Sequence, residues 1–120
     1  MDAVKPVLII DDVEGLSFYL AKTFERAGLK AYEARGGAQG IQIFKEVAPG
    51  IVMLDMHLPD MNGLDVLKEL KRINPQARIM IMSGDVELVT QLRQSNPAIE
   101  LVDKPIDMRD LFARLGLSRK

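Results

Sequence analysis

Four short apolar runs, each followed by a residue able to take part in chemistry, constrain the fold of this 120-residue chain most strongly. Apolar runs of about four residues that are bounded by acidic residues, Gly or Pro are typical of buried strands. The runs are 7–10 before Asp11 and Asp12, 51–54 before Asp55, 79–82 before Ser83, and 99–102, which is apolar apart from Glu100, before Asp103 and Lys104. Strands this apolar favour a parallel sheet that is covered on both faces.

Helix-length segments separate these runs, so the pattern alternates strand and helix five times. We expect strands at residues 7–11, 29–34, 51–55, 78–82 and 99–102. We expect helices at residues 13–27, 38–47, 64–73, 86–94 and 108–115. Asp12 is expected to cap the first helix and Gly28 to end it. The alternation predicts a single α/β domain over residues 1–120, with right-handed crossovers.

Apolar spacing indicates which helices pack firmly. The helix at 13–27 carries four apolar residues on one face: Leu16, Leu20, Phe24 and Ala27. The helix at 86–94 has only Val86, Val89 and Leu92 as anchors. Because few apolar contacts mean low local stability, we expect this helix to be the most mobile element and the place where a partner binds.

Composition excludes several classes of protein. The net charge is −1, which offers no electrostatic footprint for nucleic acid, and the chain has no cysteine for a disulfide, a thiol nucleophile or a thiolate metal site. No apolar stretch reaches the roughly 18–20 residues of a membrane span. The first residues lack the long apolar segment of a signal peptide. We therefore expect a cytoplasmic protein.

The polar residues at the strand ends predict a site. Because the C-terminal ends of parallel strands face one crevice, Asp11, Asp12, Asp55, Ser83 and Lys104 are expected to meet there. Neighbouring carboxylates repel one another, and Mg²⁺, which prefers oxygen ligands, removes that conflict. A phosphoryl group could then bind Mg²⁺, Lys104 and Ser83, with Asp55 as the nucleophile that forms an acyl phosphate.

At these residues the sequence resembles the receiver domains of two-component response regulators. The resemblance covers essentially the whole chain. Its four matching motifs are Ile9-Ile10-Asp11-Asp12, Leu54-Asp55-Met56-His57-Leu58-Pro59 with Gly63, Ile81-Met82-Ser83-Gly84, and Asp103-Lys104-Pro105.

The resemblance implies a flavodoxin-like fold with five parallel strands in the order 2-1-3-4-5. It implies that Asp55 accepts a phosphoryl group from a phosphohistidine on a sensor histidine kinase or a histidine phosphotransfer protein. Asp12, Asp55 and the backbone carbonyl of His57 would hold Mg²⁺, and Asp11 would assist through water. The protein would be a phosphorylation switch that catalyses only its own phosphotransfer and dephosphorylation.

The same resemblance assigns the remaining site residues. Ser83 would bind a phosphoryl oxygen, Lys104 would pair with Asp55 or its phosphate, and the peptide bond from Lys104 to Pro105 would be cis. Three positions depart from the family pattern, namely Leu101 where an aromatic residue is common, Gly84 where Ala is frequent, and Pro97-Ala98 where Gly-Ala is usual. All three fall on the output face, so we expect altered signalling geometry.

The implied partners are proteins. Phosphorylation would shift the face formed by residues 86–94, 99–102 and 108–115, and thereby control binding to a downstream target or to an output domain of a longer chain. The same face could form a homodimer. We expect no direct contact with nucleic acid or membrane.

Three other functions share part of this pattern. A Mg²⁺-dependent hydrolase of the haloacid dehalogenase type wants a second Asp where His57 stands, and it usually carries a cap insertion. A flavodoxin needs a phosphate-binding loop after the first strand, whereas residues 11–15 are acidic. A receiver-like scaffold that is not phosphorylated would not need all the chemical residues that are present.

Overall fold

The computed structural model describes residues 5–117, in which five strands alternate with five helices. The strands are β1 (Val7–Ile10), β2 (Ala31–Ala34), β3 (Ile51–Asp55), β4 (Arg78–Ser83) and β5 (Glu100–Asp103). The helices are α1 (Glu14–Arg26), α2 (Gly37–Val47), α3 (Gly63–Ile73), α4 (Val86–Ser95) and α5 (Met108–Leu115). Every expected element is present. Two expectations fall partly outside the described residues. They are the absence of a signal peptide at the start of the sequence and the extent of the domain over residues 1–120.

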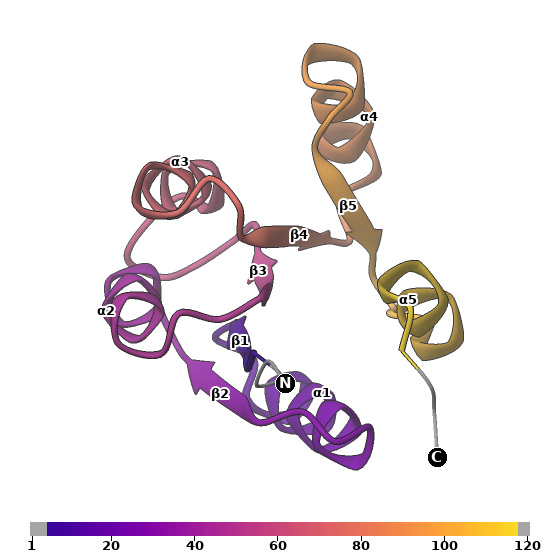
Figure 1. Cartoon of the computed structure of the whole chain (residues 1–120). Helices are drawn as coiled ribbons and strands as arrows, with labels where there is room; N and C mark the ends of the chain where they lie inside the picture. The colour runs from indigo at the N-terminus through magenta and orange to yellow at the C-terminus, as the bar shows by residue number, and fades with distance from the viewer. Residues whose placement is uncertain (1–4, 118–120) are drawn as a thin grey trace.

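The five strands form one parallel sheet in the order β2-β1-β3-β4-β5, as expected. Helices α1 and α5 cover one face, and α2, α3 and α4 cover the other (Figure 1). This three-layer arrangement is the flavodoxin-like fold. Within residues 5–117, no helix has the length and hydropathy needed to cross a membrane.

Alternate residues of each strand face the two helical layers, as the two-residue period of a strand requires. In β3, Val52 and Leu54 pack under α2, α3 and α4, while Met53 packs under α1 and α5. Phe24 and Phe112 join α1 to α5, with ring centroids 5.3 Å apart. Burying one such side chain stabilises the fold by roughly 1.5–3 kcal/mol. This two-sided core holds the strand ends, and hence the crevice, in place.

The helix ends confirm one expectation and correct two. Gly28 follows α1 with φ +91°, and it ends the helix as predicted. Asp12 does not cap α1: the N-cap residue is Val13, which makes no side-chain capping bond, and Asp11 Oδ1 instead accepts a bond from Val13 N at 2.8 Å. Val86 does not anchor α4, because it stands at the exposed start of the helix with 79% of its surface accessible.

The small number of apolar anchors in α4 is confirmed, whereas its mobility stays a prediction. Only Val89 and Leu92 of this helix are buried. Helix α4 begins at Asp85, whose side chain accepts a bond from Leu88 N, and α5 begins at Asp107, whose side chain accepts from Arg109 N and Asp110 N. Helix α4 is therefore capped in the ordinary way but held to the sheet by few apolar contacts.

Candidate functional site

The site lies at the C-terminal edge of the sheet, where four strands deliver polar residues to one crevice. Asp11 follows β1, Asp55 ends β3, Ser83 ends β4 and Lys104 follows β5. The strand register places these residues at the same edge of the sheet, because β4 pairs with both β3 and β5 and Ser83 lies opposite Asp103. The predicted strand-end residues are thus brought together.

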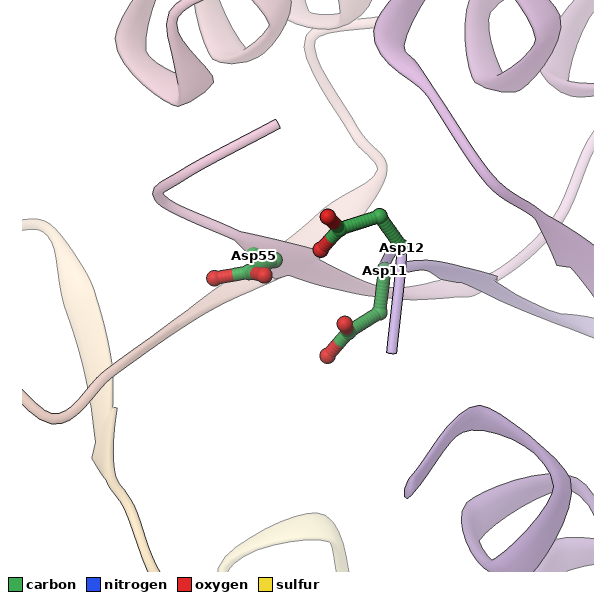
Figure 2. Close-up of side chains that lie close together, drawn as sticks. All are labelled: Asp11, Asp12 and Asp55. Carbon is green, nitrogen blue, oxygen red and sulfur yellow. The ribbon is translucent and has the colours of Figure 1, made fainter. Parts of the chain in front are cut away.

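Asp11, Asp12 and Asp55 form a compact acidic cluster. One carboxylate oxygen from each lies within 4.8 Å of the others. The Asp12 carboxylate turns toward Asp55, and the Asp11 carboxylate lies on the other side of the same space (Figure 2). Asp11 is fully buried and Asp55 is 4% exposed, whereas Asp12 is open to solvent. Three oxygen donors with one open side fit a hard cation such as Mg²⁺, which retains several waters.

Lys104 supplies the positive charge at this site. Its Nζ lies 3.4 Å from Asp55 Oδ1 and 3.5 Å from Asp11 Oδ2. Its backbone N–H donates to Ser83 O at 3.0 Å, and the Lys104–Pro105 peptide is cis, as predicted. One ammonium therefore faces two buried carboxylates, which leaves the site negative and suited to a cation.

Burial raises the pKa of Asp11 above its usual value of 3.8, and the charge of Asp55 raises it further. The hydrogen bond from Val13 and the charge of Lys104 act in the opposite direction but do not cancel the increase. Ionised Asp11 therefore carries a free-energy cost that a bound cation would relieve.

Asp55 is oriented by its neighbours. His57 N donates to Asp55 Oδ1 at 3.2 Å, and the same oxygen faces Lys104. The His57 imidazole is exposed to solvent, so this residue enters the site through its backbone. A loop closed by an antiparallel bridge between His57 and Asn62 carries that backbone.

Ser83 is 2% exposed and stands beside Lys104. Its Oγ accepts a bond from Asp85 N at 3.1 Å. Ser83 and Lys104 line a cavity of about 150 Å³ together with Thr90 and Arg93 of α4. A hydroxyl and an ammonium at the same opening can contact an anion bound above Asp55.

Sequence reasoning missed Arg35, which reaches the site from β2. Arg35 Nη1 donates to Asp11 O at 3.5 Å, and Nη2 donates to Glu33 Oε1 at 3.0 Å. Glu33 Oε1 also accepts from the buried Ser17 Oγ at 2.8 Å. Arg35 directly follows β2, but this strand is mostly half-buried, and no apolar run precedes Arg35 in the sequence.

The sequence profile of the response regulator receiver domain matches residues 7–116, and the chain belongs to this family. It is 30% identical over 107 residues to sporulation initiation phosphotransferase F of Bacillus subtilis, covering 88% of this chain and 86% of that protein. It is 39% identical over 81 residues to the chemotaxis protein CheY of Thermotoga maritima, covering 67% and 68%.

The fold is similar to solved receiver domains. The CheY-like response regulator receiver domain protein of Methanospirillum hungatei superposes with a TM-score of 0.85 at 22% identity, covering 95% of this chain and 92% of that one. Receiver domains serve two-component systems as phosphoacceptor switches rather than as classical enzymes, and they usually bind Mg²⁺ in an acidic pocket. They interact with histidine kinases or phosphotransfer proteins and with output domains.

Proposed function

We propose that this chain is a cytoplasmic phosphorylation switch in which Asp55 accepts a phosphoryl group from a phosphohistidine. The donor would be a sensor histidine kinase or a histidine phosphotransfer protein. One observation carries this proposal: Asp55 belongs to a cluster of three carboxylates and also faces the Lys104 ammonium at 3.4 Å. That combination can bind a cation and a phosphoryl group side by side.

In the proposed transfer, a carboxylate oxygen of Asp55 attacks phosphorus and forms an acyl phosphate. The bond from phosphorus to the histidine nitrogen breaks, and that nitrogen keeps the electron pair. Asp11, Asp12, Asp55 and the His57 carbonyl would hold Mg²⁺, which when bound offsets negative charge on the phosphoryl oxygens. His57 N and Lys104 Nζ both contact Asp55 Oδ1, and these contacts would help to orient the attacking carboxylate.

Ser83 and Lys104 would contact the transferred group. The Ser83 hydroxyl donates a hydrogen bond to one phosphoryl oxygen, and the Lys104 ammonium pairs with another. Both residues line the same cavity under α4, and Ser83 is almost fully buried. Electrostatic stabilisation is stronger in such a sheltered site than in water.

The output of the switch would be a shift of the face formed by α4, β5 and α5. Helix α4 buries only two side chains, so its position can respond to a change at Ser83. Leu101, where the family often has an aromatic residue, is 3% exposed and packs in the core. Signalling would therefore proceed without the swing of an aromatic ring.

The binding partners would use two surfaces. Val13, Phe18 and Tyr19 are each half-exposed on or beside α1, the helix that follows Asp11 and Asp12, and support docking of a phosphoryl-donor protein. The downstream target or output domain would bind the α4–β5–α5 face. Mixed charges line a cavity of about 340 Å³ on that face, including Arg93, Asp110 and Arg114, and they also support a homodimer.

The experiment is intact-protein mass after incubation with acetyl phosphate, with and without Mg²⁺. We expect wild type to gain one phosphoryl group only with Mg²⁺, and Asp55→Asn to gain none. Asp65→Asn is the matched control, because Asp65 is an exposed acid in the first turn of α3 and lies outside the acidic cluster, and it should gain the group as wild type does. No gain in wild type would contradict the proposal and favour a scaffold.

A further inference from the structure

Asp60 lies in the loop between β3 and α3, the loop that also contains His57. Its side chain contacts the first turn of α2. Its Oδ1 accepts a hydrogen bond from Gly37 N at 2.8 Å, and its Oδ2 accepts one from Ala38 N at 3.0 Å. The N–H groups of a first helical turn have no partner within the helix. The N-cap residue of α2 is Gly36, which has no side chain to supply one. Asp60 therefore caps α2 from another element.

The contact leaves little space for a side chain at the two glycines where α2 begins. A Cβ added at Gly36 would lie 2.8 Å from Asp60 Oδ1, and one added at Gly37 would lie 2.8 Å from Met61 Sδ. Gly36 has φ −157°, a conformation open to any residue, so a side chain there would be opposed by the Asp60 carboxylate and not by backbone geometry. The tip of the loop thus fits against the start of α2.

The base of the same loop is also fixed. His57 and Asn62 form an antiparallel bridge, and Gly63 N donates to Met56 O at 3.0 Å. A Cβ at Gly63 would lie 2.8 Å from backbone atoms of Met56, so the two sides of the base are in close contact. With base and tip both held, the backbone at His57 has little freedom to move.

We propose that Asp60 is a positioning residue for the metal site. By holding the loop tip on α2, Asp60 keeps the His57 backbone carbonyl in position relative to the Asp12 and Asp55 carboxylates. The inference rests on the proposed function, because only there does the His57 carbonyl bind Mg²⁺. It adds a residue that touches neither the metal nor the phosphoryl group.

Mg²⁺ affinity, measured by isothermal titration calorimetry on the full chain, tests this role. Asp60→Asn removes one acceptor, and Gly36→Ala displaces the carboxylate without changing charge. Asp107→Asn is the matched control: it removes the same charge and a similar two-bond helix cap, at α5. We expect the first two variants to bind Mg²⁺ about tenfold more weakly, the lower end of the effect of groups that orient metal ligands. The control should bind as wild type does, although its melting temperature falls.

The outcomes separate the two proposals. If wild type does not bind Mg²⁺, the proposed function fails. If wild type binds and all three variants match it, Asp60 has no positioning role. If Asp60→Asn weakens binding but Gly36→Ala does not, charge alone acts and the inference is again overturned. If Gly36→Ala does not fold, as circular dichroism will show, the comparison of Asp60→Asn with Asp107→Asn decides.

Discussion

Lys104 and Asp55 form an ion pair across two strand ends, with Nζ 3.4 Å from Oδ1. The same ammonium lies 3.5 Å from Asp11 Oδ2, so it is shared between two buried carboxylates. A shared cation lowers the repulsion between Asp11 and Asp55 without removing it. The stability of the metal-free protein should therefore depend on these charges, and this dependence can be measured.

Lys104→Met should destabilise the metal-free protein. Removing one partner from a buried pair typically costs about 3–5 kcal/mol, and because the Lys104 side chain is 24% exposed we expect about 2 kcal/mol at pH 7. Urea unfolding measures the change. Lys22→Met is the control, since Lys22 pairs with Glu25 on the surface, where such pairs contribute about 0–1 kcal/mol. Equal losses of unfolding free energy in both variants would show that the ion pair at the site contributes no more to stability than an exposed surface pair.

Asp11→Asn should make the metal-free protein more stable at pH 7, by on the order of 1 kcal/mol. Burial raises the pKa of Asp11 in the folded state, so wild type loses stability as the pH rises through that folded pKa. The loss is absent below the usual value of 3.8, where Asp11 is protonated in both states. Asn can still accept the bond from Val13 and carries no charge.

Unfolding in guanidinium chloride across pH 3.5–8, with a chelator present, tests this expectation. The difference between Asp11→Asn and wild type should grow with pH and then level off. A variant that is less stable than wild type at pH 7 would show that ionised Asp11 stabilises the fold.

Glu100→Gln should weaken the junction between β4, β5 and α5. Arg78 donates to the Glu100 carboxylate through Nε at 2.9 Å and Nη2 at 2.8 Å, and Nη2 also donates to Arg114 O at 3.0 Å. The hydrogen bonds from Arg78 lower the pKa of Glu100. Both side chains are more than 30% exposed, so we expect a loss of only about 1 kcal/mol at pH 7.

The sign of the pH dependence follows from the lowered pKa. The contribution of Glu100 is present above the unfolded-state value of 4.5 and is lost as the pH falls from there through the folded pKa. Thermal melts should therefore show the gap between Glu100→Gln and wild type closing below pH 4.5. Glu69→Gln, which breaks an exposed pair with Arg72 on α3, is the control and should change stability less.

Gly63→Ala and Gly15→Ala should change stability in opposite directions. A Cβ at Gly63 would meet backbone atoms of Met56 and Asp55 at 2.8–2.9 Å, and overpacking of this kind costs about 1–3 kcal/mol. A Cβ at Gly15 would meet nothing within 4 Å, and Ala in a helix is favoured over Gly by roughly 0.5–1 kcal/mol. Melting temperatures of the two variants check this, and a stabilised Gly63→Ala would contradict the close contact at the base of the loop.

The fold could be predicted because strands buried on both faces, such as β1 and β3, appear in the sequence as unbroken apolar runs. The start of β2 was predicted two residues early. Leu29 is apolar and buried, but its N–H donates to Phe24 O and closes the end of α1. Pairing with β1 begins only later, at Ala31. Apolar character alone does not distinguish these two uses of Leu29.

The site residues at strand ends could also be predicted, since the sheet brings such positions together. The expected cap at Asp12 was wrong because the Asp12 carboxylate faces Asp55, which is far away in sequence. Asp60 and Arg35 were missed for the same reason. Their partners, Gly37 and Asp11, are 23 and 24 residues away, and no local pattern connects them.

The order in which the strands are synthesised has a consequence for incomplete copies of this protein. The three acids come from the ends of β1 and β3, whereas Lys104 follows β5, which is synthesised after both of those strands. A nascent or truncated chain that ends before residue 100 would contain the three acids without the Lys104 ammonium and would leave the edge of β4 unpaired. The step that adds β5 to the edge of the sheet is thus also the step that brings the Lys104 ammonium to the three acids. On the proposed function, chains that end there would lack the Lys104 ammonium, and we expect them to accept a phosphoryl group poorly.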